Sequence, residues 1–345
     1  MSVTIMAIES SCDETAAAVV RDGRILSNCI ANQTIHEKYG GVVPELASRA
    51  HLQNIVPVVQ QALKEAFPEE TPAKALHQMD AFAFTAAPGL IGSLLVGAQF
   101  SKSLALSLNK PLLAVHHMQA HVLANLLSER PPAFPFVCLT VSGGHTQLVL
   151  AKAPLELDII GETIDDAAGE AFDKIAKLIG LPYPGGPLVD QFAREGNPHA
   201  FTFAQPRVPG LNFSFSGLKT SVLYFLQKQP FDFIEKNKAD LCASVQHAIV
   251  SMLMRNLKKA VEQTGVKEVC IAGGVSANSL LRKALQEAGA RLGWRTHQPD
   301  FAFCTDNAAM IAVTGYYQYL AGQTVSLDAP VEAVSHWKAP AFNQE

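Results

Sequence analysis

One order of elements occurs twice along this chain, and it limits the folds that the chain can adopt. An apolar strand leads into a polar turn of small residues, and a second strand returns from that turn. In the first half, Asp22-Gly23 is the signal for a further hairpin and a third strand. The expected strands cover residues 3–8, 16–20 and 24–30 in the first half, and residues 136–141 and 147–150 in the second.

Each hairpin is followed later by a strand, a glycine-containing loop and an apolar helix. In the first half, residues 80–85 lead into a loop with Gly89 and Gly92, and the helix runs to about Leu108. In the second half, residues 268–272 lead into Gly273-Gly274 and a helix to about Ala288. The repeated order predicts a duplicated α/β unit with two lobes and a ligand cleft between them.

We expect an N-terminal lobe of residues 1–110, completed by the C-terminal region 305–345. Residues 111–304 are then the C-terminal lobe, which would carry the metal helix and the nucleotide loops. Within that lobe, residues 165–178 predict a helix with an acidic start, and residues 211–219 predict strand and loop.

Composition favours a well-buried globular protein of the cytoplasm. Of the 345 residues, 48% are hydrophobic and 17% charged, and the net charge is −4. A nucleic-acid partner would therefore need a local basic patch or charge from another subunit. The six cysteines form no C-x-x-C pair, which favours reduced thiols, and no uninterrupted apolar run has the length of a membrane span.

A pair of histidines, His117 and His121, is the first candidate site. The run that follows, to residue 127, has no glycine, proline or charge, so we expect a helix with both imidazoles on one face. Such a pair is either half of a divalent-metal site or hydrogen-bonded core. Met118 occupies the place where the H-E-x-x-H protease motif needs a general base.

A third ligand is needed, and Asp306 is the candidate. It precedes a helix expected over residues 307–320, where its side chain would either cap the helix or complete a two-histidine, one-carboxylate set.

Glycine-rich turns after strands are typical phosphate-binding elements, although each alone is more often a matter of backbone geometry. Three such turns, Ser142-Gly143-Gly144, Pro88-Gly89 and Gly273-Gly274, favour a nucleotide cleft, and none matches the Walker pattern. Asp13 is either an ordinary turn residue or an acidic group near metal or phosphate. Asp173 and Asn278 either contact ribose or base, or have no ligand role.

Together these motifs resemble the bacterial tRNA threonylcarbamoyladenosine transferase family, TsaD, nearly from end to end. The motifs, in chain order, are Glu9-Ser-Ser-Cys-Asp-Glu-Thr15, Val43-Pro-Glu-Leu-Ala-Ser-Arg-Ala-His51, Pro88-Gly-Leu-Ile-Gly-Ser-Leu94, His117-Met-Gln-Ala-His121, Val141-Ser-Gly-Gly-His-Thr-Gln-Leu148, Asp165-Asp-Ala-Ala-Gly-Glu-Ala-Phe-Asp-Lys174, Tyr183-Pro-Gly-Gly-Pro187, Phe213-Ser-Phe-Ser-Gly-Leu-Lys-Thr220, Gly273-Gly-Val-Ser-Ala-Asn278 and Thr305-Asp-Asn307.

The resemblance implies a two-lobed actin/Hsp70/sugar-kinase (ASKHA) fold. It implies transfer of a threonylcarbamoyl group from threonylcarbamoyl-AMP to the exocyclic amine of the adenosine 3′ of the anticodon, in tRNAs that read ANN codons. It also implies a divalent metal, Fe²⁺ in preference to Zn²⁺, and an adenylate or ATP-type nucleotide. The residues that it assigns are His117, His121 and Asp306 to the metal, Thr140, Val141, Ser142, Gly143, Gly144, Asp173, Gly186 and Asn278 to the adenylate, and Asp13 and Glu14 to catalysis.

The resemblance further implies partners: tRNA, a paralogous subunit (TsaB), a small ATPase (TsaE) and a TsaC-type synthase that supplies the donor. One departure is Ala87, where family members usually have glycine. Three rival functions share parts of the pattern, namely a sugar- or acetate-kinase-like phosphotransferase, a metal-dependent glycoprotease and a nucleotide-binding scaffold.

Overall fold

The computed structural model describes residues 2–33, 36 and 39–333, and within these residues the chain forms two five-stranded sheets. Each sheet belongs to its own compact unit. The first unit comprises the described residues through Pro131 and from Asp300 onward, and the second is Pro132–Pro299. We describe each unit by itself.

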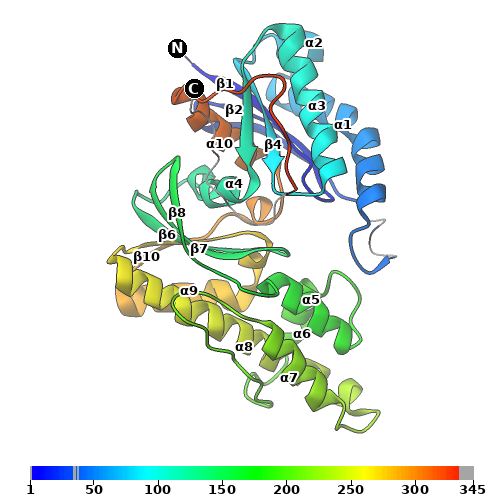
Figure 1. Ribbon diagram of the computed structural model, residues 1–345, viewed down its shortest axis with the longest axis vertical. Helices are drawn as coiled ribbons and strands as arrows, with labels where there is room; N and C mark the ends of the chain where they lie inside the picture. The colour runs from blue at the N-terminus through cyan, green and yellow to red at the C-terminus, as the bar shows by residue number, and fades with distance from the viewer. Residues whose placement is uncertain (1, 34–35, 37–38, 334–345) are drawn as a thin grey trace. The chain divides into compact units, whose positions relative to one another are not determined.

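The first sheet has the strand order β3-β2-β1-β4-β5 (Figure 1). β1, β2 and β3 form an antiparallel meander, while β1, β4 and β5 run parallel. The bounds are β1 Thr4–Glu9, β2 Thr15–Arg21, β3 Arg24–Ala31, β4 Ala81–Ala87 and β5 Leu112–His116. The three expected strands of the first hairpin are confirmed within one or two residues at each end.

Alternate side chains of β1 enter two different cores, because successive strand residues face opposite sides of a sheet. Met6 and Ile8 pack with helices α1 (Pro44–Ala66) and α3 (Ile91–Leu108), and Ile5 packs with α10 (Ala308–Leu320). The first sheet is therefore covered by helices on both faces, and the chain's C-terminal segment supplies one of the covers.

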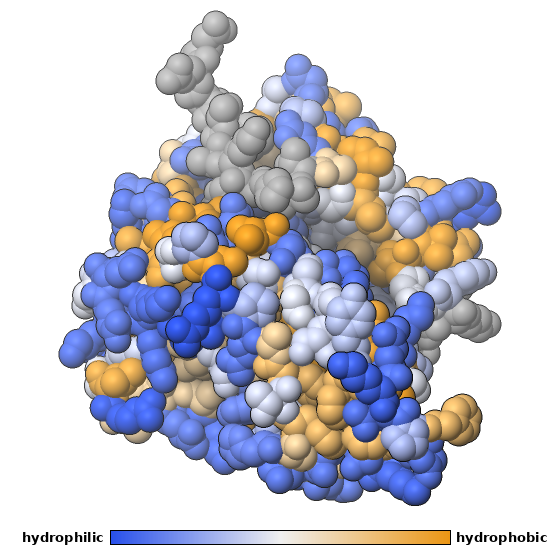
Figure 2. All heavy atoms as spheres, turned by 60° about the horizontal axis from the view of Figure 1, so that its bottom comes forward, coloured by the Kyte–Doolittle hydropathy of each residue, from blue (hydrophilic) through white to orange (hydrophobic). Residues whose placement is uncertain are grey.

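Helix α3 is long and apolar enough to cross a membrane by length and composition alone. It packs against α1 and β4, as a core helix of a globular unit does, and it is the one such helix in the part of the chain that the structure describes. On the face shown in Figure 2, hydrophobic residues form separate patches among hydrophilic ones.

The second sheet has the order β10-β9-β6-β7-β8, which matches the first sheet strand for strand. β6, β7 and β8 form the antiparallel meander, and β6, β9 and β10 run parallel. The bounds are β6 Phe136–Val141, β7 Thr146–Ala153, β8 Glu156–Glu162, β9 Glu268–Ala272 and β10 Arg295–His297. The predicted duplication is therefore confirmed as two sheets of one topology.

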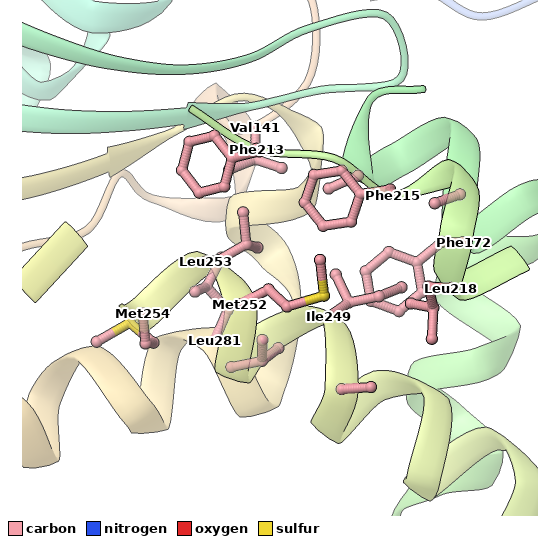
Figure 3. Close-up of a cluster of buried hydrophobic side chains, with 14 of the residues drawn as sticks. Val141, Phe172, Phe213, Phe215, Leu218, Ile249, Met252, Leu253, Met254 and Leu281 are labelled. Atoms are coloured by element: carbon pink, nitrogen blue, oxygen red, sulfur yellow. The ribbon is translucent and has the colours of Figure 1, made fainter. Parts of the chain in front are cut away.

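In the second unit, helices α5, α6 and α9 pack against the long helix α8, and α7 packs against α5. Figure 3 shows Phe213 and Phe215 lying above α8, and their rings are stacked with centroids 6.1 Å apart. This core also includes Phe172 and Ile249. The helices of the second unit are α5 Ala168–Leu178, α6 Gly185–Ala193, α7 Ser216–Leu226, α8 Phe233–Thr264 and α9 Ser279–Leu292; the remaining elements are α2 Pro72–Leu76, α4 His117–Leu123 and the 3-10 turns Ala124–Leu127, Gly274–Ala277 and Phe301–Phe303.

Two features differ from the expectations. The first unit extends to Pro131 rather than ending at residue 110, because β5 pairs with β4 and the histidine helix α4 follows β5 directly. Residues 211–219 contribute only an isolated bridge at Phe213, and α7 begins at Ser216. The carboxylate of Asp165 accepts the amides of Phe215 and Ser216, so a side chain distant in sequence starts that helix.

Candidate functional site

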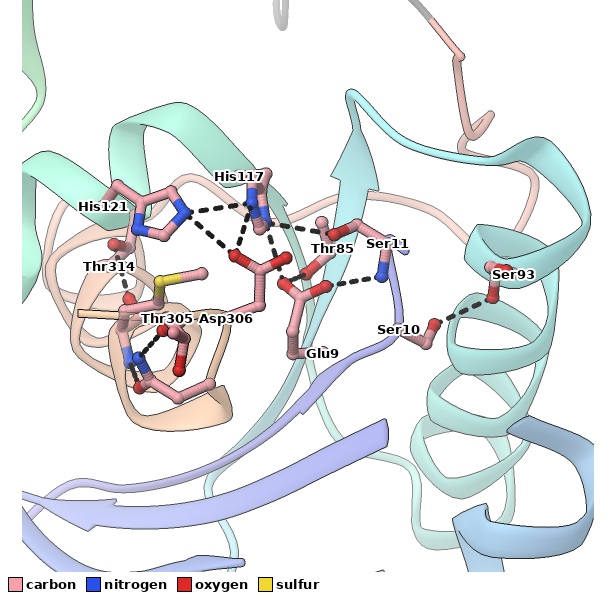
Figure 4. A network of polar contacts seen from close by, with 12 residues as sticks. Glu9, Ser10, Ser11, Thr85, Ser93, His117, His121, Thr305, Asp306 and Thr314 are labelled. Atoms are coloured by element: carbon pink, nitrogen blue, oxygen red, sulfur yellow. Dashed lines mark hydrogen bonds and ion pairs between the residues drawn. The ribbon is translucent and has the colours of Figure 1, made fainter. Parts of the chain in front are cut away.

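His117 and His121 lie on α4, which is buried along its whole length. The α-helix begins at His117 directly after β5 and ends at Leu123, where a 3-10 turn continues the predicted helix. One turn of helix brings the rings edge to face, with centroids 4.6 Å apart (Figure 4). Their Nε2 atoms lie 3.1 Å from each other.

Asp306 reaches this pair from the start of the last helix. Its Oδ1 lies 3.3 Å from Nε2 of His117 and 3.1 Å from Nε2 of His121. The capping role belongs to the next residue, Asn307, whose side chain accepts the amide of Met310 at 3.0 Å. The structure therefore brings the three predicted ligands together, and the alternative of Asp306 as a helix cap is wrong.

The three donor atoms have the spacing of one face of a metal coordination shell. A metal ion about 2.0–2.1 Å from each donor sets neighbouring donors about 2.9 Å apart in an octahedral shell and about 3.4 Å apart in a tetrahedral one. The separations of 3.1, 3.1 and 3.3 Å fall within this range. Among the described residues, this is the one cluster of three or more histidine, cysteine or carboxylate side chains with such spacing.

Glu9 supports the cluster, and the sequence analysis did not identify it. Its side chain is completely buried at the end of β1, and Oε2 lies 3.0 Å from Nδ1 of His117. Thr85 donates its hydroxyl to the same oxygen at 2.6 Å, and the amide of Ser11 donates to Oε1 at 2.5 Å. The signal in the sequence was a single glutamate at the end of an apolar strand. A carboxylate buried there needs several hydrogen-bond donors, so its neighbours can be expected to include polar groups of a site.

These groups control one another's protonation. Burial favours the neutral form of each group, but the charge of His117 holds the pKa of Glu9 and that of Asp306 below their ordinary values. Burial likewise opposes a charged His117, and the two carboxylates raise its pKa well above the ordinary value. In the absence of a metal, the protonated imidazole of His117 lies between the carboxylates of Glu9 and Asp306. The surroundings of His117 therefore stabilise a positive charge.

The acidic turn with Asp13 and Glu14 connects β1 to β2 and is held by His51 of α1. Nε2 of His51 donates to the carbonyl of Cys12 at 3.0 Å, so Nδ1 is the acceptor for the hydroxyl of Thr15 at 2.8 Å. Burial, together with the negative charges of Asp306 and Asp13, raises the pKa of Glu14 to about 10. Glu14 is therefore a neutral acid at pH 7 in the absence of a bound cation.

In the second unit, the predicted nucleotide turn follows β6. Thr140 and Val141 are fully buried strand residues, while Gly143 and Gly144 are exposed. Among the described residues, the amides of Gly143 and Gly144 have no acceptor, whereas Ser142 is engaged with His145 on both its amide and its hydroxyl. The part of this segment that can receive a ligand is therefore the glycine pair.

The turn rests directly on helix α5. A Cβ atom on Gly169 would lie 2.5 Å from the carbonyl oxygen of Ser142 and 2.9 Å from Cα of Gly143. On the other side, Gly273 has a φ of +83°, and a Cβ atom there would lie 2.4 Å from the carbonyl oxygen of Val141. Two glycines thus allow α5 and the β9 turn to support the Gly143-Gly144 turn.

Three further predicted nucleotide residues have structural partners. The carboxylate of Asp173 accepts the amides of Gly185 and Gly186, at 2.8 and 3.0 Å, at the start of α6. Burial raises the pKa of Asp173 despite these hydrogen bonds. Asn278 caps α9 by accepting the amide of Leu281 at 3.0 Å. The amide of Gly186 and one oxygen atom of each of these two side chains are therefore already engaged.

The loop with the unusual Ala87 remains anchored to the first hairpin. Ala87 is the last residue of β4 and pairs with His116. The amide of Leu90 donates to the carbonyl of Ser11, and a Cβ atom on Gly89 would lie 2.5 Å from that oxygen. The close approach to the Ser11 turn therefore depends on Gly89.

Solved structures with this fold define the class. The chain resembles HypF of T. kodakarensis with a TM-score of 0.64 at 14% identity, covering 93% of this chain and 48% of that one. The (R)-2-hydroxyglutaryl-CoA dehydratase component A of Acidaminococcus fermentans has a TM-score of 0.52 at 13% identity, covering 93% and 99%. The fold is that of the two-lobed actin/Hsp70/sugar-kinase class.

Sequence comparison narrows the class to one family. The model of the family TsaD, tRNA N6-adenosine threonylcarbamoyltransferase, matches residues 24–313. Proteins of that description from Cytophaga hutchinsonii and Porphyromonas gingivalis are 57% and 56% identical, over 96% and 95% of this chain and 96% of each relative. The chain belongs to the tRNA N6-adenosine threonylcarbamoyltransferase family. The kinase, protease and scaffold alternatives are not favoured.

Proposed function

We propose that this protein transfers the threonylcarbamoyl group from threonylcarbamoyl-AMP to N6 of the adenosine 3′ of the anticodon, in tRNAs that read ANN codons, and releases AMP. The observation that carries the proposal is the convergence of His117, His121 and Asp306 from two distant segments, in a chain of this family.

The chemistry requires positioning and charge stabilisation. The donor is a mixed carbamic–phosphoric anhydride, and the adenine amine is a weak nucleophile that must be held against its carbonyl carbon. A new C–N bond forms, the bond from this carbon to the phosphate oxygen breaks, and AMP leaves with the electron pair. The amine also loses one proton, which we assign to Asp13 as acceptor, since this carboxylate lies on the turn that follows Glu9.

We assign one divalent metal ion to His117, His121 and Asp306, Fe²⁺ in preference to Zn²⁺. Two histidines and one carboxylate on a single face of a coordination shell are typical of iron(II), and the donor separations between the octahedral and tetrahedral values leave Zn²⁺ as the alternative. Such an ion supplies open positions for donor oxygens and acts as a Lewis acid.

We assign the adenylate phosphate to the Gly143-Gly144 turn. Its two amides have no acceptor within the described segments, and backbone amides in such turns are suited to phosphate oxygens. Thr140, Val141 and Ser142 shape this turn, and Asp173, Gly186 and Asn278 are the proposed contacts for the rest of the adenylate.

We further propose that a TsaB-like paralogue docks on the outer face of α1 and α3. These two helices pack together, and each exposes a pair of large apolar residues one turn apart, Leu52 with Val56 and Ile91 with Leu95. A TsaE-like ATPase and a TsaC-type synthase complete the proposed system. We assign this system to the cytoplasm, in agreement with a tRNA substrate.

The test is reconstitution with transcribed tRNA, threonylcarbamoyl-AMP and the two partner subunits. Nucleoside analysis by mass spectrometry should detect threonylcarbamoyladenosine in a tRNA that reads an ANN codon. The matched control is the same tRNA with guanosine in place of the target adenosine, which should remain unmodified. Absence of the product with all components present would contradict the proposal.

A further inference from the structure

We propose that Glu9 is a positioning residue of the metal centre, which fixes the tautomer of His117 and ties this ligand to the acidic turn. The inference rests on the metal site proposed above. It concerns a residue with a completely buried side chain, which acts through the ligand beside it.

The hydrogen bonds of Glu9 determine which nitrogen of His117 can face a metal ion. A carboxylate only accepts hydrogen bonds, so the 3.0 Å contact of Oε2 with Nδ1 requires a proton on Nδ1. In the neutral imidazole, Nε2 then carries the lone pair, and it points at Asp306 and His121. Glu9 therefore selects the tautomer that a metal ligand needs.

A glutamine could not replace this glutamate without loss. Both oxygens of Glu9 receive donors, Oε1 from the amide of Ser11 and Oε2 from His117 and the hydroxyl of Thr85. In either orientation of a glutamine, its NH₂ group would face one of these donors. The site is thus built for a carboxylate.

Charge balance leads to the same conclusion. A divalent ion held by two neutral imidazoles and the carboxylate of Asp306 keeps one uncompensated positive charge in a largely buried place. Glu9, whose side chain is completely buried, supplies a compensating negative charge on the far side of the His117 ring from the ion.

The second histidine has no equivalent support. Nδ1 of His121 is buried and has no hydrogen-bond partner within the described part of the chain. Within the described residues, Glu9 is therefore the one carboxylate that contacts Nδ1 of either imidazole, and we expect its removal to affect metal affinity strongly.

Glu9 also connects the metal ligand to the acidic turn. Its Oε1 holds the amide of Ser11, and Ser11 directly precedes Cys12, Asp13 and Glu14. The hydroxyl of Ser11 lies 3.3 Å from Nδ1 of His117. One buried carboxylate thus fixes Ser11 of the turn relative to the ligand.

The test is the Zn²⁺ affinity of the full chain, measured by competition with a chromophoric chelator. We expect Glu9→Gln to weaken binding about 10- to 100-fold. The matched control is Glu268→Gln, which makes the same change at another buried glutamate that contacts a histidine, His297 at 2.6 Å, and it should leave Zn²⁺ affinity within about 2-fold of the unsubstituted protein. Thr85→Val removes one other donor to Glu9 and should cost less than about 5-fold.

A second readout separates positioning from a structural effect. In zinc-loaded protein with ¹⁵N-labelled histidine, a hydrogen-bonded Nδ1–H signal of His117 should be present in the unsubstituted protein and in Thr85→Val, and absent or shifted in Glu9→Gln. Should Glu9→Gln fail to fold, Glu9→Asp carries the test, because its shorter side chain keeps the charge and loses reach to Nδ1. We expect it to weaken Zn²⁺ binding at least about 5-fold.

Unchanged affinity in the folded Glu9 variant, with tight binding by the unsubstituted protein, overturns the role of Glu9 alone. An equal loss in Glu9→Gln and Glu268→Gln also overturns it, since the effect would then be one of general stability. Failure of the unsubstituted protein to bind Zn²⁺ overturns the metal site itself, and with it this inference.

Discussion

Oδ1 of Asp306 lies 3.1 Å from Nε2 of His121, although 185 residues separate the two in the chain. The contact exists because α10 returns to the first unit and packs against α4 and the first sheet. The candidate metal centre is therefore complete only when the C-terminal helix has docked. Binding of a metal to this set stabilises the docked helix by mass action.

The neighbours Asp306 and Asn307 should have separable effects. Asp306→Ala removes one of three ligands, so we expect the metal content of the purified protein to fall from about one ion per chain to less than about a tenth of that. Asn307→Ala removes the cap of α10 and should lower the free energy of unfolding by about 1–2 kcal/mol, with the metal retained. Elemental analysis and urea unfolding measure the two effects, and metal retention by Asp306→Ala would contradict the assignment.

Asp13 and Glu14 should differ in their importance for transfer. We expect Asp13→Asn to slow transfer by about 100-fold or more, as expected for loss of a general base. Burial and nearby carboxylates raise the pKa of Glu14 to about 10 in the absence of a bound cation, and no proton transfer is assigned to this side chain. Glu14→Gln keeps its size and should cost less than about 10-fold. Single-turnover rates with excess enzyme provide the comparison. A larger loss of rate in Glu14→Gln than in Asp13→Asn would contradict the assignment of Asp13 as the proton acceptor.

Gly273 should tolerate no side chain. Gly273→Ala combines a left-handed φ with a Cβ atom 2.4 Å from the Val141 carbonyl oxygen, and we expect it to lower the free energy of unfolding by more than about 3 kcal/mol. Gly265→Ala is the matched control, because Gly265 has a φ of +70° and no atom within 4 Å of its added Cβ atom. It should cost only about 1–2 kcal/mol. Equal losses in urea unfolding would show that the close approach is not a constraint.

Glu268 should contribute stability that depends on pH. Burial alone would raise its pKa, but hydrogen bonds from Arg295 and His297 hold the pKa below the ordinary value of 4.5. A carboxylate with a lowered pKa in the folded state stabilises fully above its unfolded pKa and loses this effect as the pH falls through its folded pKa. Glu268→Gln should therefore cost about 1–2 kcal/mol at pH 7 and progressively less below about pH 4.5. A cost that does not change between pH 7 and pH 3.5 would contradict this account.

Local patterns were sufficient to predict the duplication and seven of the ten strands of the described residues, but not β5, β8 and β10. The first hairpin follows from Asp22-Gly23 between apolar runs, and the repeated strand–glycine loop–helix order follows from periodicity over short windows. The start of α7 could not be predicted in this way, because a distant carboxylate, Asp165, accepts its first amides.

The sequence was sufficient to predict the metal ligands of the candidate site. It was not sufficient to predict Glu9, the residue that supports them. The spacing of His117 and His121 predicts that both lie on one helix face. Asp306, an acidic residue just before a helix, is compatible with either a helix cap or a metal ligand, and the sequence alone does not decide between them. The structure decides between these roles because Asn307 takes the cap. The role of Glu9 depends on donors from three separate segments, Ser11, Thr85 and His117, which no local pattern contains.

The most direct test is a metal titration of the metal-free protein during the transfer reaction with complete partners and tRNA. We predict that transfer is absent without metal and rises with added Fe²⁺ or Zn²⁺ to a plateau at one ion per chain, and that His121→Ala does not recover at the same metal concentration. Full transfer by protein that contains no metal, or equal recovery by His121→Ala, would contradict the assignment of a catalytic metal to His117, His121 and Asp306.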